Sequence, residues 1–180
     1  VTLDGGGATR LLSATDPEVR LLLAGLTLTG GNGEGAGTGG GAVYAAGDVT
    51  LDTVEIRANA TLGDDAAGGG LRVGGTLLML DSTVAENATS GQNAKGGGVW
   101  AGGSVFVSGG AIAGNSTSGA YAGGGGLHAQ GPVLVSLARI ADNATAGLSA
   151  GGGGLSGASE ITLSRVTVSG NATYGTTSNG

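Results

Sequence analysis

Residues 96–118 read GGGVWAGGSVFVSGGAIAGNSTS, and residues 124–146 repeat the same order of residue types as GGGLHAQGPVLVSLARIADNATA. A Gly run is followed by three short apolar stretches and then by an Asn. That Asn recurs every 28 residues, at Asn59, Asn87, Asn115, Asn143 and Asn171. A constant interval without insertions predicts a stack of equal units in which residues 28 apart are spatial neighbours.

Three short strands are indicated in each unit, because aliphatic and largely β-branched residues alternate with others there. The first strand carries Val43, Leu71, Val99, Leu127 and Leu155. The second carries Val49, Leu77, Val105, Val133 and Ile161, with a further apolar column two residues on. The third carries Ile56, Val84, Ile112, Ile140 and Val168, and a loop is expected after each Asn.

These features predict an all-β fold, a parallel β-helix of about six coils with three short strands in each 28-residue coil. A helical solenoid is the alternative, but no segment has 3.6-residue spacing and the Gly runs would break helices. We interpret residues 1–180 as one β-helix segment, with irregular first coils in 1–42 and regular coils in 43–180. Residues 30–39 are expected to form a Gly-rich loop. Because the chain begins with Val1, we expect it to be part of a longer protein.

Composition excludes several classes of function. The net charge is −6 with only 7 Lys and Arg, which argues against nucleic acid or an anionic membrane as partner. The absence of Cys excludes disulfides and thiolate metal sites. No stretch approaches the ~18 apolar residues of a membrane span, so we expect no membrane insertion.

The Gly40-Gly41-Ala42-Val43 start and the Ile56-Arg57-Ala58-Asn59 pattern resemble the GGA[ILV] and FxxN repeats of bacterial polymorphic outer-membrane proteins, with Ile or Val in place of Phe. Residues 3–10 and 26–31 resemble the start of secreted bacterial right-handed β-helix repeat proteins. The resemblance covers the whole chain and implies right-handed winding and an extracellular or outer-surface location. It says little about activity, because β-helices serve as lyases, hydrolases, adhesins and inert stalks.

The repeated Asn has two interpretations, and the Thr two residues later adds a third. In a stacked ladder at a corner, each Asn bonds its neighbours and takes a left-handed backbone. Every copy also opens an Asn-X-Thr sequon, a candidate N-glycosylation site. The Thr column is a candidate for O-glycosylation or a flat hydroxyl array, at Thr61, Thr89, Thr117, Thr145 and Thr173. We favour the ladder, because glycans one strand spacing apart would crowd.

Two outward columns carry large side chains. The first strand presents Tyr44, Arg72, Trp100 and His128, which we call the aromatic strip. Stacked Tyr, Arg and Trp form cation–π contacts and also stack on sugar rings, so the strip is a candidate glycan-binding surface. We favour the alternative that a loop or a subunit covers it.

The second strand presents Leu78, Phe106 and Leu134 between Thr50 and Thr162. A row of large apolar side chains avoids water. We expect the long loop to cover this column, and the alternative is a lateral self-association interface.

Catalysis is not indicated. β-Helix enzymes that cleave acidic polysaccharides use clustered carboxylates, whereas the carboxylates here are dispersed along the chain. His128 is the only His, which excludes a His relay or a multi-His metal site. We therefore expect no enzymatic activity, no cofactor and no metal. Ice binding would need a flat Thr-X-Thr array, and only one Thr per coil recurs.

The sequence therefore favours a structural extracellular or cell-surface β-solenoid, such as a stalk, an adhesin passenger or a filament subunit. Open parallel-strand edges predict self-association, end to end or lateral. A carbohydrate-binding β-helix is the alternative, and a polysaccharide lyase or hydrolase is less favoured.

Overall fold

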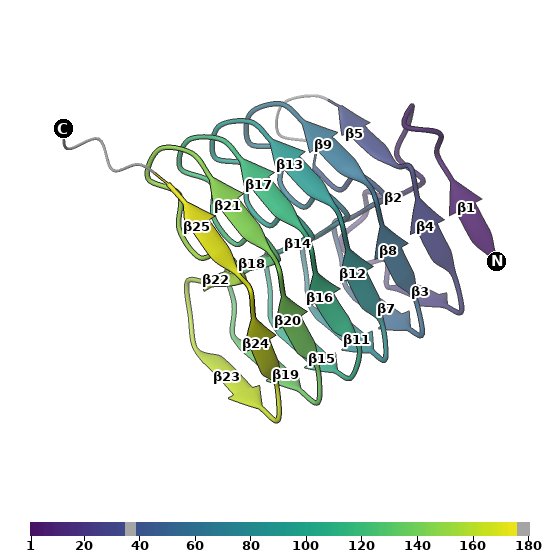
Figure 1. Ribbon diagram of the computed structural model, residues 1–180. Coiled ribbons are helices and arrows are strands. Elements are labelled where there is room, and N and C mark those ends of the chain that lie inside the picture. The colour runs from purple at the N-terminus through teal and green to yellow at the C-terminus, as the bar shows by residue number, and fades with distance from the viewer. Residues whose placement is uncertain (35–38, 176–180) are drawn as a thin grey trace.

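The structure, a computed structural model, describes residues 1–34 and 39–175. Within these residues the chain forms 25 short strands and no helix. The strands build four parallel sheets, three with six strands and one with seven, so that the coils stack along one axis (Figure 1). The predicted all-β parallel β-helix with a 28-residue coil is confirmed.

Each regular coil visits the four sheets in the order B, C, A and D. Sheet B contains β2 (Leu12–Ala14), β6 (Val43–Ala45), β10 (Leu71–Val73), β14 (Val99–Ala101), β18 (Leu127–Ala129) and β22 (Leu155–Gly157). Sheet C contains β3 (Leu21–Ala24), β7 (Val49–Asp52), β11 (Leu77–Leu80), β15 (Val105–Ser108), β19 (Val133–Ser136) and β23 (Ile161–Ser164). Sheet A contains β1 (Thr2–Asp4), β4 (Thr27–Thr29), β8 (Glu55–Arg57), β12 (Thr83–Ala85), β16 (Ala111–Ala113), β20 (Arg139–Ala141) and β24 (Thr167–Ser169). Sheet D contains β5 (Asn32–Glu34), β9 (Ala60–Leu62), β13 (Ala88–Ser90), β17 (Ser116–Ser118), β21 (Ala144–Ala146) and β25 (Ala172–Tyr174).

Sheet D is a finding beyond the three predicted strands of each coil. It lies where the sequence predicts the start of the loop, immediately after the repeated Asn. Its strands pair in register, for example Thr61 with Thr89 and Thr89 with Thr117. Small residues dominate this sheet, so the usual apolar signal of a strand is missing, and pairing with identical neighbours keeps the backbone extended.

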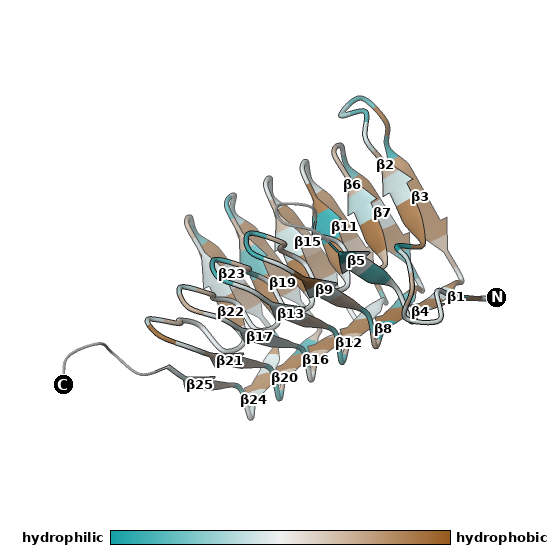
Figure 2. Ribbon diagram, turned by 90° about the horizontal axis from the view of Figure 1, so that it is seen from above, coloured by the Kyte–Doolittle hydropathy of each residue, from teal (hydrophilic) through white to brown (hydrophobic). Residues whose placement is uncertain are grey.

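The inward columns form one continuous apolar core. Leu77, Met79 and Val84 are fully buried, as are most of their counterparts in the neighbouring coils. Hydrophobic segments recur along sheets A and C when the solenoid is seen from above (Figure 2). Each coil therefore buries its aliphatic side chains against the next, which makes stability additive along the axis.

The irregular first coils keep the sheet pairing with altered spacing. β1 pairs with β4 through Thr2 and Thr27, and β2 pairs with β6 through Leu12 and Val43, before the 28-residue interval begins. Within the predicted loop at 30–39, Asn32–Glu34 forms β5, and residues 35–38 lie outside the described part. Gly31 takes the place of a ladder Asn, and its N–H donates to Oδ1 of Asn59 at 2.7 Å.

Candidate functional site

The repeated Asn side chains form one hydrogen-bonded column at the corner between sheets A and D. Nδ2 of Asn87 donates to Oδ1 of Asn115 and to the main-chain oxygen of Ile56, both at 2.9 Å. The same Oδ1 of Asn115 accepts the main-chain N–H of Asn87 at 3.0 Å. Matching side-chain bonds link Asn59 to Asn87, Asn115 to Asn143 and Asn143 to Asn171. The column thus satisfies backbone groups at the sharp corner.

The left-handed backbone expected at the Asn lies one residue earlier. Ala58, Glu86 and Asp142 have φ angles of 53°, 58° and 56°, and Gly114 and Gly170 occupy the same position with 64° and 65°. None of the five ladder Asn residues has a positive φ. The expectation was wrong because the Asn directs its side chain into the coil, so the residue before it makes the bend.

The glycosylation interpretations do not fit this geometry. The side chains of Asn59, Asn87, Asn115 and Asn143 are at most 1% exposed, and each Nδ2 atom is already a donor. A glycan has no access to an amide in that position. Asn171, in the last coil, is partly buried, and its Nδ2 donates to the main-chain oxygens of Ile140 and Ser169.

The Thr column also points into the coil, which excludes an outward hydroxyl array there. Thr61, Thr89, Thr117 and Thr145 are at most 1% exposed, while Thr173 in the last coil is exposed. Oγ1 of Thr61 donates to the main-chain oxygen of Ala66 at 2.8 Å. The hydroxyls of Thr89, Thr117 and Thr145 have no hydrogen-bond partner.

The aromatic strip is a stack of alternating rings and cations on the outer face of sheet B. The Arg72 guanidinium lies 5.8 Å from the ring centroid of Tyr44 and 5.0 Å from that of Trp100. A second cation, the Arg10 guanidinium, lies 5.4 Å from the Tyr44 ring centroid, and its Nε donates to the main-chain oxygen of Gly40 at 2.9 Å. Sequence reasoning missed Arg10, because it lies in the irregular first coil outside the repeat columns.

The long loop between sheets D and B lies along one side of this strip. An added Cβ at Gly39 would lie 2.9 Å from Cδ of Arg72, and one at Gly123 would lie 3.6 Å from Oγ of Ser156. The same loop position in the intervening coils is held by Ala67 and Lys95. Tyr44, Arg72 and Trp100 are consequently half-buried, in partial agreement with the expected cover.

His128 is the most enclosed member of the strip. It is 8% exposed, and its Nδ1 lies 3.2 Å from Oγ of Ser156. Burial, and to a smaller extent the charge of Lys95, lower the pKa of His128 to about 4. The imidazole is therefore neutral at physiological pH. Of the seven cationic side chains in the sequence, Arg10, Arg72 and Lys95 gather at this strip.

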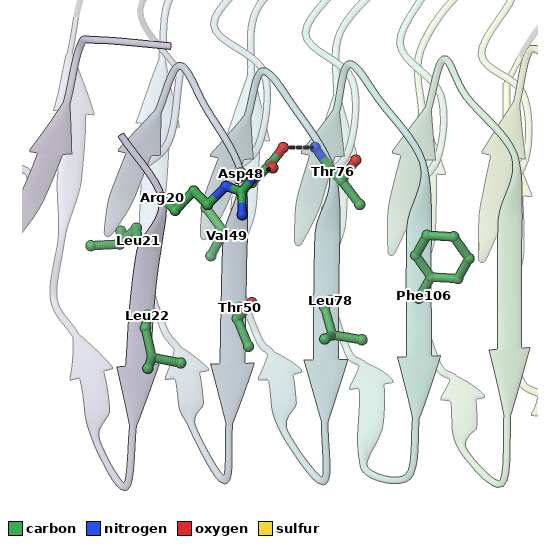
Figure 3. A pocket seen from close by; sticks show the side chains of 9 residues that line it. All are labelled: Arg20, Leu21, Leu22, Asp48, Val49, Thr50, Thr76, Leu78 and Phe106. Carbon is green, nitrogen blue, oxygen red and sulfur yellow. Dashed lines mark hydrogen bonds and ion pairs between the residues drawn. The ribbon is translucent and has the colours of Figure 1, made fainter. Parts of the chain in front are cut away.

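The column on sheet C is open, so the expectation that a loop covers it was wrong. Phe106 and Leu134 are each 42% exposed, and Leu22, which extends the column into the first coil, is 68% exposed. A shallow depression of about 360 Å³ lies over this face, between Leu22, Thr50, Leu78 and Phe106 (Figure 3). The loop that we expected here lies instead between sheets D and B.

Residues 1–34 and 39–175 contain neither a cluster of metal-ligating side chains nor a candidate membrane-spanning helix. No group of three or more His, Asp or Glu side chains is placed to hold a metal ion there. Nor does this part of the chain contain a helix with the length and apolar character that crossing a membrane requires.

Comparisons of the chain with known protein families, with curated proteins and with solved structures find no match.

Proposed function

We propose that this chain is a structural β-solenoid of a secreted or surface-displayed bacterial protein, serving as a stalk, an adhesin passenger or a filament subunit. The coils from Val43 onward have equal length, which suits a stiff rod whose length follows from repeat number. The motif resemblance to polymorphic outer-membrane and secreted β-helix repeat proteins supports the outer-surface location and the right-handed winding. We expect no catalysis by this segment.

The observation that carries the proposal is the unbroken in-register pairing of equivalent strands from coil to coil, as for β7, β11 and β15.

The last described coil leaves its inward columns open. Ile161, Leu163 and Val168 occupy inward columns, yet they are 40%, 43% and 54% exposed. Their counterparts one coil earlier, Val133, Val135 and Ile140, are at most 2% exposed. β22 to β25 are also the edge strands of their sheets, and such edges accept another strand. A further coil of the same chain or the first coil of another copy would cover this end, and we propose that copies stack end to end.

The distribution of charge favours head-to-tail stacking. Residues 1–86 contain 11 acidic and 4 basic residues, a net charge of −7. Residues 87–180 contain 2 acidic and 3 basic residues, a net charge of +1. Joining an acidic half to a weakly basic half avoids the repulsion that two acidic halves would meet, and salt weakens that preference.

Electron microscopy of the purified chain tests the stacking. We expect rods or fibres whose number grows with concentration. Val168→Lys should abolish them, because it places a charge on the end face, whereas Thr167→Lys, on the outward side of the same strand, should leave them intact. Discrete monomers at high concentration, or fibres that persist in Val168→Lys, would refute end-to-end stacking.

A glycan-binding role is the second candidate, supported by the half-exposed Tyr44–Arg72–Trp100 stack. The Arg10 and Lys95 cations beside it favour acidic sugars. A glycan array with the wild type, with Trp100→Ala and with Tyr121→Ala separates the roles, because Tyr121 is exposed outside the strip. Binding that Trp100→Ala removes and Tyr121→Ala retains is the expected result. No binding, or equal binding by all three, would eliminate this candidate.

A further inference from the structure

The outward column of sheet C holds one residue from each of six coils, Leu22, Thr50, Leu78, Phe106, Leu134 and Thr162, and we call it the lateral strip. We propose that the lateral strip is the interface of an antiparallel dimer of this chain, with a two-fold axis that runs along the strands between β11 and β15. The interface uses the side of the solenoid and not its ends. It is therefore independent of end-to-end stacking.

The exposure and shape of the strip are suited to docking. Leu22, Phe106 and Leu134 protrude with 42–68% of their surface exposed. Thr50 is small, so a depression opens over it between the side chains of Leu22 and Leu78 (Figure 3). Apolar knobs and an apolar-walled depression on one flat sheet are what face-to-face packing of two sheets requires.

The order of large and small residues along the strip makes two antiparallel copies of it complementary. From the first coil to the sixth, the strip reads Leu, Thr, Leu, Phe, Leu, Thr. In the antiparallel dimer, Leu134 of one copy faces the depression at Thr50 of the other, and Leu22 faces Thr162. Leu78 faces Phe106 at the centre. Every small residue meets a large one, which is the condition for interdigitation without voids.

The charges beside the strip agree with the same arrangement. The neighbouring outward column begins with Arg20 and ends with Glu160. Arg20 is 87% exposed and only loosely paired with Asp48 at 3.8 Å, so it is free to reach across the interface. The carboxylate of Glu160 lies on this face beside Thr162, whose Oγ1 donates to it at 3.1 Å. Reversal of one copy places Arg20 opposite Glu160 at both ends of the interface.

The parallel arrangement lacks both kinds of complementarity. A two-fold axis along the solenoid would place each coil opposite itself, so that Leu faces Leu, Phe faces Phe and the depression at Thr50 faces Thr50. It would also place Asp48 opposite Asp52, and like charges across an interface are unfavourable. The acidic half of each chain, residues 1–86, would then lie along the acidic half of its partner.

The area of the sheet places the dimer among small, weak interfaces. Six strands at ~4.8 Å spacing and four residues of ~3.3 Å each give roughly 380 Å² per copy. The total of roughly 760 Å² lies below the ~1,200 Å² of stable complexes. We therefore expect a reversible dimer that dissociates on dilution.

Thiol cross-linking tests the geometry, because the chain contains no Cys. Thr50→Cys and Leu134→Cys are prepared separately, mixed and treated with a short bismaleimide that bridges the ~10 Å spacing of two packed sheets, and we expect a cross-link between the two variants. Each variant alone should remain largely uncross-linked, because its two thiols would be displaced by three coils, about 14 Å, in addition to that spacing. Cross-linking of Thr50→Cys with itself in preference to Leu134→Cys would establish the parallel arrangement and overturn the proposal.

Sedimentation equilibrium tests the energetics, on a Val168→Lys background that blocks stacking at the ends. Phe106→Glu should weaken the dimer by at least about 100-fold, because a charge would be buried at its centre. The matched control is Leu62→Glu, a substitution at an equally exposed Leu on sheet D, which should change nothing. Glu160→Arg should weaken the dimer roughly 3- to 10-fold, and adding Arg20→Glu should restore it.

The two assembly proposals fail in different ways. A chain that stays monomeric in solution up to ~1 mM on the blocked background, yet forms fibres without Val168→Lys, would overturn the lateral dimer alone. A closed dimer without fibres would overturn end-to-end stacking alone.

Discussion

Oδ1 of Asn115 accepts two hydrogen bonds from Asn87 one coil away, from the main-chain N–H at 3.0 Å and from Nδ2 at 2.9 Å. Both residues are fully buried. The relation repeats in every regular coil, so each corner depends on the side chain of the next. This coupling between coils leads to the first prediction.

Asn115→Ala should lower the free energy of unfolding by about 3 kcal/mol or more, because buried groups of Asn87, Asn143 and Val84 each lose a hydrogen bond. Urea denaturation measures the change. Asn171→Ala is the control in the last coil, where water reaches the freed groups, and we expect a loss of about 1 kcal/mol. Equal losses in the two variants would show that burial of the ladder does not set its contribution.

The Thr column allows a matched pair of isosteric substitutions. Thr117→Val removes a buried hydroxyl without a partner, so we expect about 1 kcal/mol of stabilisation. Thr61→Val removes a hydroxyl that donates to Ala66, so we expect a loss of about 1 kcal/mol. Thermal unfolding of the two variants side by side provides the test, and a change of the same sign in both would contradict the assignment.

Leu137 has a φ of 55°, which strains the backbone of a non-Gly residue. Its side chain is 60% exposed, so burial stabilises it little. Leu137→Gly should raise the free energy of unfolding by about 0.5–1 kcal/mol, because relief of the strain exceeds the added chain entropy of Gly.

The position equivalent to Leu137 in the first coil is a Gly, so the opposite substitution can be made there. Gly25 has a φ of 62°, and no atom lies within 4 Å of an added Cβ. Gly25→Ala should therefore destabilise the fold by about 1 kcal/mol through the backbone alone. Denaturant titration of both variants tests the pair, and destabilisation by Leu137→Gly would show that its side chain contributes packing.

The pH dependence of stability should reveal His128. Its pKa is lowered from 6.5 to about 4 in the folded chain, chiefly by burial. Between these pH values His128 is therefore protonated in the unfolded chain but largely neutral in the folded chain. The contribution to stability is complete above pH 6.5 and is lost as the pH falls towards about 4, with no further loss below that value.

The difference between wild type and His128→Gln isolates this effect, because the carboxylates titrate in both proteins. Urea denaturation at several pH values gives the free energy of unfolding of each protein. The difference between the two free energies should change between pH 6.5 and about 4. Lys95→Gln should make the wild-type slope shallower, because it removes the cation that helps to lower the pKa. A difference that is constant with pH would refute the assignment.

Most of the core was predictable from the sequence. The inward positions of Leu77, Met79 and Val84 follow from period-two alternation, and pairing with equivalents 28 residues away follows from the constant interval. The Asn column was predictable for the same reason, although its backbone conformation was not. Whether Ala58 or Asn59 takes the bend depends on which way the Asn side chain must point.

The cover of the outer faces was not predictable in the same way. The aromatic strip and the lateral strip are both outward columns on adjacent strands of each coil. The loop residues Gly39, Ala67 and Lys95 lie over the first of them, so that the second stays open.

The sequence by itself thus determined the coil length, the inward columns and the ladder, because these are periodic properties that repeat as contacts between identical neighbours. Only the tertiary structure decided which hydroxyls are buried without partners, where Arg10 lies and which apolar face is open. Those outcomes depend on the path of the loop between sheets D and B. Its Gly and small residues recur every 28 positions, but they carry no alternation of apolar and polar residues that would specify that path.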